Sequence, residues 1–126
     1  MILKNGFLFP LIAIFLISGC APRKASREYV QVGYASYYGR EFSGRRTASG
    51  EKYDPKKLTA AHPTLPFNTY VKVTNLENGK SVIVRINDRG PFKKGRIIDL
   101  SEKAAELLDM KIKGVVLVKL EVVAWP

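Results

Sequence analysis

A chain of 126 residues, 46% of them hydrophobic, is long enough for one small globular domain and too short for a second. Its 21 lysines and arginines outnumber 11 acidic residues, and the net charge of +10 favours an anionic partner such as nucleic acid, an anionic membrane surface or an acidic polymer. The single cysteine, Cys20, excludes an intramolecular disulfide, so the domain must be stabilised by its core.

The N-terminal residues have the features of an export signal. A lysine precedes an apolar run over residues 7–17, which is shorter than the ~20 residues that cross a bilayer. A basic start, a short apolar run and small residues are typical of a secretory signal peptide. The small residues end at Cys20, which resembles the lipobox of bacterial lipoproteins; an ordinary signal peptide with an incidental cysteine is the alternative. We predict a signal peptide over residues 1–19, a lipidated tether over residues 20–30 and a folded domain over residues 31–126.

Lipidation of Cys20 would fix where the domain works. Each buried methylene of an acyl chain contributes ~0.8 kcal/mol, so several chains hold a protein to a membrane effectively permanently. Ala21 follows the cysteine, which resembles the pattern for release to the outer membrane. We therefore expect a lipid-anchored domain on the periplasmic side of a bacterial membrane, with the outer membrane as its expected location.

From Gln31 onward most segments alternate apolar and polar residues with a period of two, which is typical of strands. Ser101 can cap a short helix that ends near Leu108, with Glu102 favourable in its first turn. The strands are expected over residues 32–38, 58–62, 69–76, 81–86, 97–100 and 115–123.

Two local patterns refine this arrangement. Asn78 and Gly79 separate two strands and predict a hairpin, because both residues tolerate the positive φ of a type I′ turn. The nearly unbroken apolar run over residues 115–123 predicts burial on both faces of the last strand. About six strands and one helix in ~95 residues favour a small β-barrel over a two-layer sandwich, since closure removes exposed edges.

Two segments carry candidate chemistry. Residues 47–62 gather Glu51, Asp54 and the only histidine, His62, around a glycine turn in a chain where acids are scarce. Such a grouping suggests proton chemistry, although aspartate and serine near glycine and proline also form ordinary turns. The second segment places Asp88 where the chain leaves an apolar strand. Together the two segments predict a divided active site.

Six short motifs follow one another between about Val32 and Val123. They are Gly33–Gly39, Thr47–Asp54, Leu58–His62, Leu65–Phe67, Asn87–Phe92 and Ile98–Ser101. In this order they resemble the rare lipoprotein A family. The resemblance implies a mainly β fold, a six-stranded double-psi β-barrel with one short helix, which expansins and some cellulases share. It also implies an endolytic peptidoglycan lytic transglycosylase that prefers glycan strands stripped of their peptides.

The implied reaction needs one carboxylic acid. This acid protonates the glycosidic oxygen and then accepts a proton as the muramic acid 6-hydroxyl attacks C1. Asp88 is the predicted acid, because it matches the family's motif aspartate and a rigid Gly-Pro turn follows it; an Asx turn is the alternative. Glu51 and Asp54 are expected opposite it, where like charges raise one carboxyl pKa. His62 is expected to orient a carboxylate or to contact sugar.

Other side chains are expected to bind the substrate. Arg45 and Arg89 suit the lactyl carboxylates that are left when peptides are removed. One of Tyr37 and Tyr38 is expected to face the cleft while the other packs in the core, because neighbouring residues of a strand point to opposite faces. Asp99 is expected to hold a backbone turn before the helix, with a substrate contact as the alternative.

The sequence also limits cofactors and partners. One histidine without a cysteine partner does not form the usual zinc set, so no metal and no cofactor are expected, although the acids leave calcium open. The expected partners are peptidoglycan glycan strands and, through Cys20, a membrane; the domain is expected to be a monomer. Nucleic acid is disfavoured by export and by the lack of an interleaved aromatic and basic strand. The rival function is that of a noncatalytic, expansin-like module that binds peptidoglycan.

Overall fold

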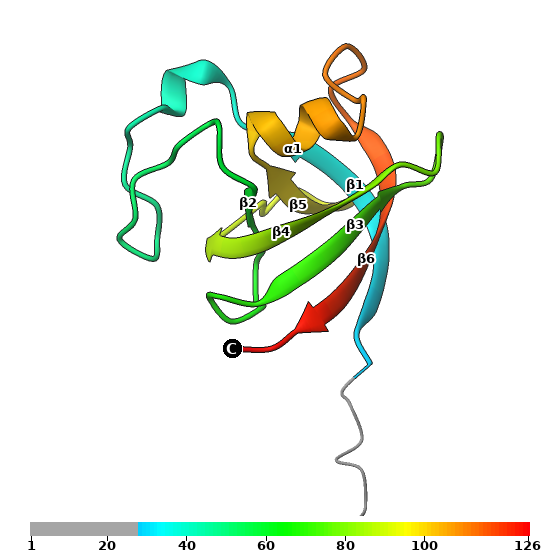
Figure 1. Ribbon diagram of the computed structural model, residues 1–126, viewed down its shortest axis with the longest axis horizontal. Coiled ribbons are helices and arrows are strands. Elements are labelled where there is room, and N and C mark those ends of the chain that lie inside the picture. The colour runs from blue at the N-terminus through cyan, green and yellow to red at the C-terminus, as the bar shows by residue number, and fades with distance from the viewer. Residues whose placement is uncertain (1–27) are drawn as a thin grey trace, which may run out of the picture.

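Six strands close into a barrel in the computed structural model, which describes residues 28–126 (Figure 1). The order of the strands around the barrel is β1-β5-β2-β4-β3-β6. The β1–β5 and β2–β4 pairs are parallel and the other four pairs are antiparallel. The elements are β1 (Val30–Tyr37), the 3-10 helix η1 (Arg40–Phe42), β2 (Thr59–Ala61), β3 (Tyr70–Asn75), β4 (Ser81–Asp88), β5 (Arg96–Leu100), α1 (Glu102–Leu107) and β6 (Val116–Ala124). The predicted mainly β barrel with one short helix is confirmed.

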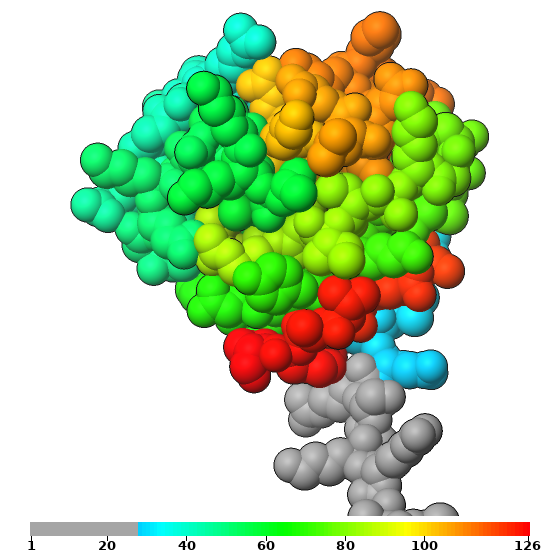
Figure 2. Space-filling model, in the orientation of Figure 1, coloured from blue at the N-terminus to red at the C-terminus, as the bar shows by residue number. Residues whose placement is uncertain are grey.

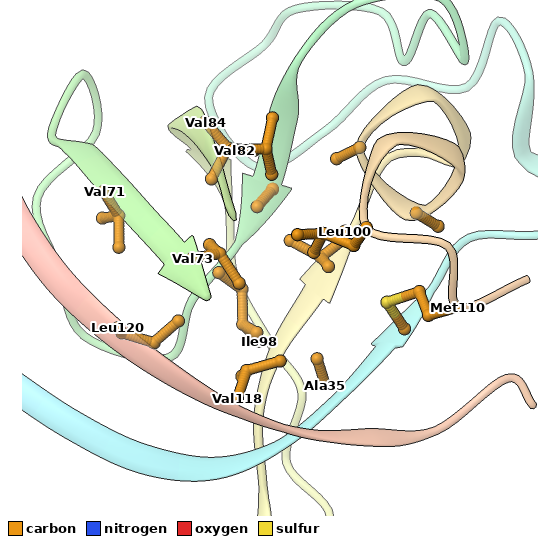
Figure 3. Close-up of a cluster of buried hydrophobic side chains, with 14 of the residues drawn as sticks. Ala35, Val71, Val73, Val82, Val84, Ile98, Leu100, Met110, Val118 and Leu120 are labelled. Carbon is orange, nitrogen blue, oxygen red and sulfur yellow. The ribbon is translucent and has the colours of Figure 1, made fainter. Parts of the chain in front are cut away.

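The core fills the barrel with side chains from alternate strand positions (Figure 3). Period-two alternation turns every second residue inward, so branched aliphatic residues from the strands meet in the interior. The helix α1 contributes Ala104 and Ala105 to the same cluster. Fully buried members of the core include Val71, Val73, Val84, Ile86, Ile98, Leu100, Val118 and Leu120.

The predicted helix start is confirmed. The Ser101 hydroxyl oxygen accepts a hydrogen bond from the Ala104 backbone N–H at 3.2 Å, which satisfies one of the N–H groups that have no partner within the helix. The helix ends at Leu107, one residue before its predicted end.

The predicted type I′ turn is wrong. Gly79 has a positive φ of 77°, but Asn78 is not among the described residues with positive φ. The chain instead makes a longer connection, in which Asn75 accepts a hydrogen bond from the Gly79 N–H and donates one to the Lys80 carbonyl. The Asn78 side chain donates to the Leu108 carbonyl at 3.0 Å. A contact with the end of α1, which is remote in sequence, therefore accompanies this turn geometry.

The last strand is buried on one face only, contrary to the prediction. Val116, Val118 and Leu120 point into the core, whereas Leu117 and Lys119 between them are partly exposed. The outer wall of a single barrel contacts solvent, so an apolar run in it does not require a second buried layer.

The folded domain begins earlier than the predicted boundary at residue 31. Val30 already belongs to β1, and the Tyr29 carbonyl accepts a hydrogen bond from the Val122 N–H. The Tyr29 ring also meets the rings of His62 and Trp125 edge to face. The predicted signal peptide and Cys20 lie outside the described residues. Within residues 28–126, no helix has the length and apolar character needed to cross a membrane.

Candidate functional site

The candidate site lies on the outer face of the barrel wall, where four adjacent strands align a row of residues. Ser36 on β1 pairs with Asp99 on β5, and Ala61 on β2 pairs with both Asp99 and Asp88 on β4. Neighbouring strands are about 4.8 Å apart, so the α-carbons of the two aspartates are about 10 Å apart across β2. The residue between them, Ala61, is fully buried.

A long loop between η1 and β2 projects beside this row. Figure 1 shows it extending from the barrel next to the end of β4, and Figure 2 shows its cyan-to-green surface against the yellow-green surface of β4. The Ala48 N–H donates to Asp88 Oδ1 at 2.8 Å, and the Ser49 N–H donates to the Asn87 carbonyl at 3.3 Å. The loop therefore contributes a backbone donor directly to the site.

Asp88 is held by three donors. Oδ1 accepts from the backbone N–H groups of Ala48 and Arg89, both at 2.8 Å, and Oδ2 accepts from the Tyr38 hydroxyl at 2.6 Å. An ionised carboxylate is an acceptor only, and this arrangement matches that state. Burial, followed by the hydrogen bond to Asp88, raises the pKa of Tyr38, so the phenol keeps its proton and remains a donor.

Asp99 has a different environment. It is half-buried, and its Oδ1 accepts a short hydrogen bond from the Ser36 hydroxyl. Burial raises the pKa of Asp99, and the Asp88 charge adds to this rise, while Ser36 and Arg96 oppose it. The expectation that Asp99 holds a backbone turn is therefore wrong: its described partner is a side chain on β1, and its charged neighbour is Asp88.

A cleft of about 220 Å³ opens beside Asp88. Tyr38 forms part of its wall, with ring centroids 4.8 Å from Tyr53 and 5.7 Å from Phe42. The Arg45 guanidinium lies 5.2 Å from the Phe42 ring centroid at the exposed side of the cleft. The lining residues are Tyr38, Phe42, Arg45, Arg46, Thr47, Tyr53 and Asp88.

Glu51 does not face Asp88 as a like-charged partner. Its two carboxylate oxygens each accept a hydrogen bond from the Arg85 guanidinium at 2.9 Å, and Asn87 Nδ2 donates to the carboxylate at 3.0 Å. These hydrogen bonds, that from Arg85 first, hold the pKa of Glu51 below its usual value. Asp54 accepts from the Lys56 N–H, and both acids line a neighbouring cavity of about 630 Å³. Glu51 thus fastens the loop to β4. In the described part of the chain, neither Glu51 nor Asp54 has a hydrogen bond to Asp88, and the acid whose pKa the Asp88 charge raises is Asp99.

His62 is buried, with 2% of its surface exposed. Its Nδ1 accepts from the N–H groups of Thr64 and Leu65, both at 3.1 Å, so the proton resides on Nε2 and is donated to Gln31 Oε1 at 2.9 Å. Burial and the nearby Arg89 charge lower its pKa to about 4. Both ring nitrogens are occupied by uncharged partners, so His62 does not orient a carboxylate of the described chain.

Two other predicted sugar contacts have structural partners. Arg89 donates to the carbonyls of Leu65 and His62 and lies 4.1 Å from the Phe67 ring centroid. Tyr37 packs against the core and donates its hydroxyl to the Lys111 carbonyl at 2.9 Å. Of the tyrosine pair, Tyr38 is therefore the residue at the cleft.

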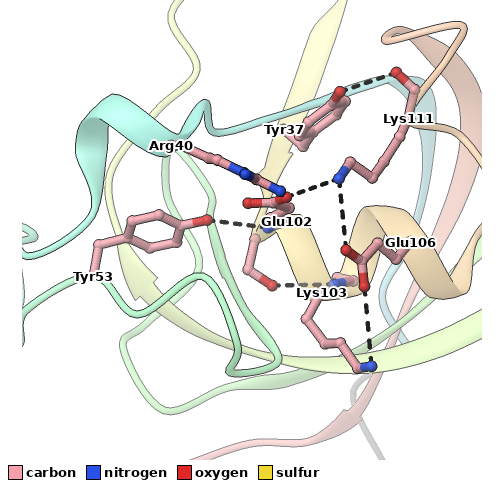
Figure 4. Close-up of polar contacts among 9 residues, drawn as sticks. Tyr37, Arg40, Tyr53, Glu102, Lys103, Glu106 and Lys111 are labelled. Carbon is pink, nitrogen blue, oxygen red and sulfur yellow. Dashed lines mark hydrogen bonds and ion pairs between the residues drawn. The ribbon is translucent and has the colours of Figure 1, made fainter.

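The far side of the loop is fastened to α1 (Figure 4). The Glu102 N–H donates to the Tyr53 hydroxyl at 3.0 Å, and the Glu102 carboxylate pairs with Lys111 at 2.7 Å and Arg40 at 3.2 Å. The Lys103 N–H donates to the Pro55 carbonyl at 3.0 Å. These contacts fix the position of the Tyr53 ring, which forms part of the wall of the cleft. The sequence did not identify Ser36, Tyr53 and Glu102 as residues that hold the site, because each of them contacts a partner that is remote in sequence.

Within residues 28–126, no three His, Cys, Asp or Glu side chains gather closely enough to hold a metal ion.

The family model described as lytic transglycolase, a double-psi β-barrel, matches residues 30–120. The endolytic peptidoglycan transglycosylase RlpA of Neisseria meningitidis serogroup A is 54% identical over 100 residues, which cover 79% of this chain and 42% of the relative. The protein of the same name from Pseudomonas aeruginosa (strain UCBPP-PA14) is 56% identical over 100 residues, covering 79% of this chain and 29% of the relative. The chain thus spans less than half the length of these curated relatives.

Solved structures share the fold. The apo structure of an expansin from Clavibacter michiganensis has a TM-score of 0.61 at 20% identity and covers 78% of this chain and 52% of its own. A Streptomyces papain inhibitor has a TM-score of 0.58 at 25% identity, with coverage of 76% of this chain and 96% of its own. The expansin likeness supports the barrel architecture alone.

Proposed function

We infer, because this chain belongs to the lytic transglycolase family, that its barrel cleaves the glycan strands of peptidoglycan and leaves 1,6-anhydromuramyl ends. The observation that carries this inference is the pair of aspartates, Asp88 and Asp99, that flanks β2, with Asp88 in the wall of an open cleft. Arg45 and Arg46 line that cleft, and their guanidinium groups suit the lactyl carboxylates of strands stripped of peptides. Peptide-free strands are therefore the proposed substrate.

We propose Asp99 as the acid, and the sequence prediction of Asp88 stands as the alternative that variants of the two residues distinguish. A general acid must hold a proton near the working pH, and burial raises the pKa of Asp99 in that direction. Asp99 gives its proton to the glycosidic oxygen as the bond from that oxygen to C1 of the muramic acid breaks. The 6-hydroxyl oxygen of the same sugar then bonds to C1, and its proton returns to Asp99. Water is neither consumed nor released, and the acid is restored.

Asp88 supplies negative charge in the same step. Its carboxylate is fixed by Tyr38 and by two backbone donors, so it does not have to reorient when positive charge develops at C1 and the ring oxygen. The loop is tied to Asp88 through Ala48 and to β4 through Glu51. Glu51 is therefore a positioning residue in this proposal.

The direct test is the full chain incubated with chemically defined glycan strands, with and without peptides. The expected products carry anhydromuramyl ends, which mass spectrometry distinguishes because they are lighter by one water than hydrolysis products. Peptide-free strands should be cut faster, since their lactyl carboxylates are free. Retention of the protein on the strands without any new ends would favour the noncatalytic expansin-like binder. Reducing ends without the anhydro bond would indicate a hydrolase.

The proposed location is the periplasmic side of the outer membrane, through a lipid on Cys20. The support is the sequence, in which a short apolar run ends at Ser18-Gly19-Cys20. Cys20→Ser should move the protein from the membrane fraction to the soluble fraction, or leave it with an uncleaved signal peptide. Metabolic labelling with a fatty acid should mark the unaltered protein and not the variant. Equal labelling of both proteins would refute lipidation at Cys20.

A further inference from the structure

Phe92 is an aromatic side chain that the fold leaves in solvent. Phe92 comes after Gly90 and Pro91 in the segment that follows β4, and 83% of its surface is exposed. A single exposed apolar residue is ordinary on a protein surface and by itself indicates nothing. The position of Phe92 relative to the acid pair is what distinguishes it.

Gly90 provides a common reference point for Phe92 and Asp99. The position that a β-carbon on Gly90 would occupy is 3.8 Å from Phe92 Cε2 and 3.9 Å from Asp99 Oδ2. The ring edge and this carboxyl oxygen are therefore no farther apart than the sum of these distances. This oxygen, Oδ2, is not the one that accepts the hydrogen bond from Ser36, which is Oδ1.

We propose that Phe92 is a sugar-stacking platform, on which an amino-sugar ring next to the scissile bond lies while Asp99 reaches the glycosidic oxygen. This proposal rests on the proposed function and adds a subsite to it. One face of a pyranose carries C–H groups with partial positive charge, and the face of an aromatic ring is negative, so the two attract beyond the area they bury. An exposed ring at this distance from the acid fixes where the sugar lies.

The residues after Phe92 match an acidic sugar polymer. Lys93 and Lys94 are exposed, and neither forms an ion pair with a residue in the described part of the chain. Two free ammonium groups beside a stacked ring can reach the carboxylate of a neighbouring muramic acid. Lys93 and Lys94 therefore favour an acidic sugar polymer, in agreement with the proposed substrate.

Ile112 provides a matched control. It is fully exposed and also adjoins lysines, Lys111 and Lys113, but these pair with Glu102 and Glu77 respectively. It lies between α1 and β6 and is not among the residues that line the cleft. Removing its side chain takes away a similar exposed apolar group without altering the proposed subsite.

The experiment measures binding and turnover separately in the full chain. Binding of peptide-free glycan fragments is measured by calorimetry on an Asp99→Asn parent, so that cleavage does not interfere. Adding Phe92→Ala should raise the Kd about tenfold, Phe92→Tyr should restore it, and Ile112→Ala should leave it unchanged. In the active protein, Phe92→Ala should raise KM by a similar factor with kcat within about twofold.

Each outcome decides the proposal. An unchanged Kd for Phe92→Ala, an equal effect of Ile112→Ala, or a parent that binds no glycan would overturn the platform. If the unaltered protein yields no anhydro product but Phe92→Ala still weakens glycan binding, cleavage fails and the platform stands as a feature of a binding module. If cleavage occurs and Phe92→Ala lowers kcat alone, the loop acts on the acid and Phe92 is not a sugar contact.

Discussion

Asp99→Asn is expected to lower the initial rate of anhydromuramyl product formation by at least about 10²-fold. The amide keeps the shape of the side chain and its contact with Ser36, but it has no acidic proton to give to the leaving oxygen. The rate is measured by chromatography of products from peptide-free strands at saturating substrate. Binding of the same strands should persist, because the loss concerns the chemical step.

Asp88→Asn is the matched comparison for this variant. It removes one negative charge two strands away, and its single amide oxygen can accept either from Tyr38 or from the N–H groups of Ala48 and Arg89. We expect a smaller loss than in Asp99→Asn, because the proton donor remains. A full loss in Asp88→Asn together with retained activity in Asp99→Asn would return the role of acid to Asp88, where the sequence motif first placed it.

Thermal stability provides a check that does not depend on activity. Because burial raises the pKa of Asp99 in the folded protein, ionising this carboxyl costs folding free energy. This loss of folding free energy is absent below the ordinary pKa of an aspartate, and it grows as the pH rises from that value through the raised pKa of Asp99 in the folded protein. Asp99→Asn removes the cost, so its Tm should exceed that of the unaltered protein at pH 7. The two Tm values should converge at acid pH. A lower Tm at pH 7 would indicate that Asp99 is held as a charged structural group.

Much of the fold follows from local sequence. Period-two alternation places the strands, and Ser101 marks the start of α1, because both signals depend on residues within a few positions of one another. The wrong predictions concern features that depend on contacts between residues remote in sequence. The apolar run in β6 indicates a strand but does not show what covers its outer face, and Asn78 adopts a turn in which its side chain contacts Leu108 about 30 residues away.

The site was harder to predict because its contacts cross the barrel. The sequence placed Glu51 opposite Asp88, whereas Glu51 binds Arg85, which lies three positions before Asp88 on β4. The row that joins Ser36, Asp99 and Asp88 exists only because β5, β2 and β4 are adjacent in a closed sheet. Resemblance to a family identified which motifs matter, but the neighbour of each carboxyl group depends on strand order.

His62 has a structural role in the fold, and its titration makes this role measurable. Neutral Nδ1 accepts from the N–H groups of Thr64 and Leu65, and these bonds fix the turn after β2. A proton on Nδ1 would abolish both. The histidine is buried, so its pKa in the folded protein is lowered to about 4 from an ordinary value of 6.5.

The sign of the pH effect follows from these two values. Between about pH 6.5 and pH 4 the unfolded chain binds a proton at His62 and the folded chain does not, so stability falls as pH falls through this window. The difference in pKa corresponds to about 3 kcal/mol of unfolding free energy that is present at pH 7 and lost at pH 4. Denaturant unfolding of the full chain at a series of pH values measures it. His62→Gln keeps an acceptor and a donor but does not titrate. Its unfolding free energy should therefore fall by about 3 kcal/mol less than that of the unaltered protein between pH 7 and pH 4. Equal losses in the two proteins would show that the imidazole is protonated in the folded state and is not held neutral by the turn.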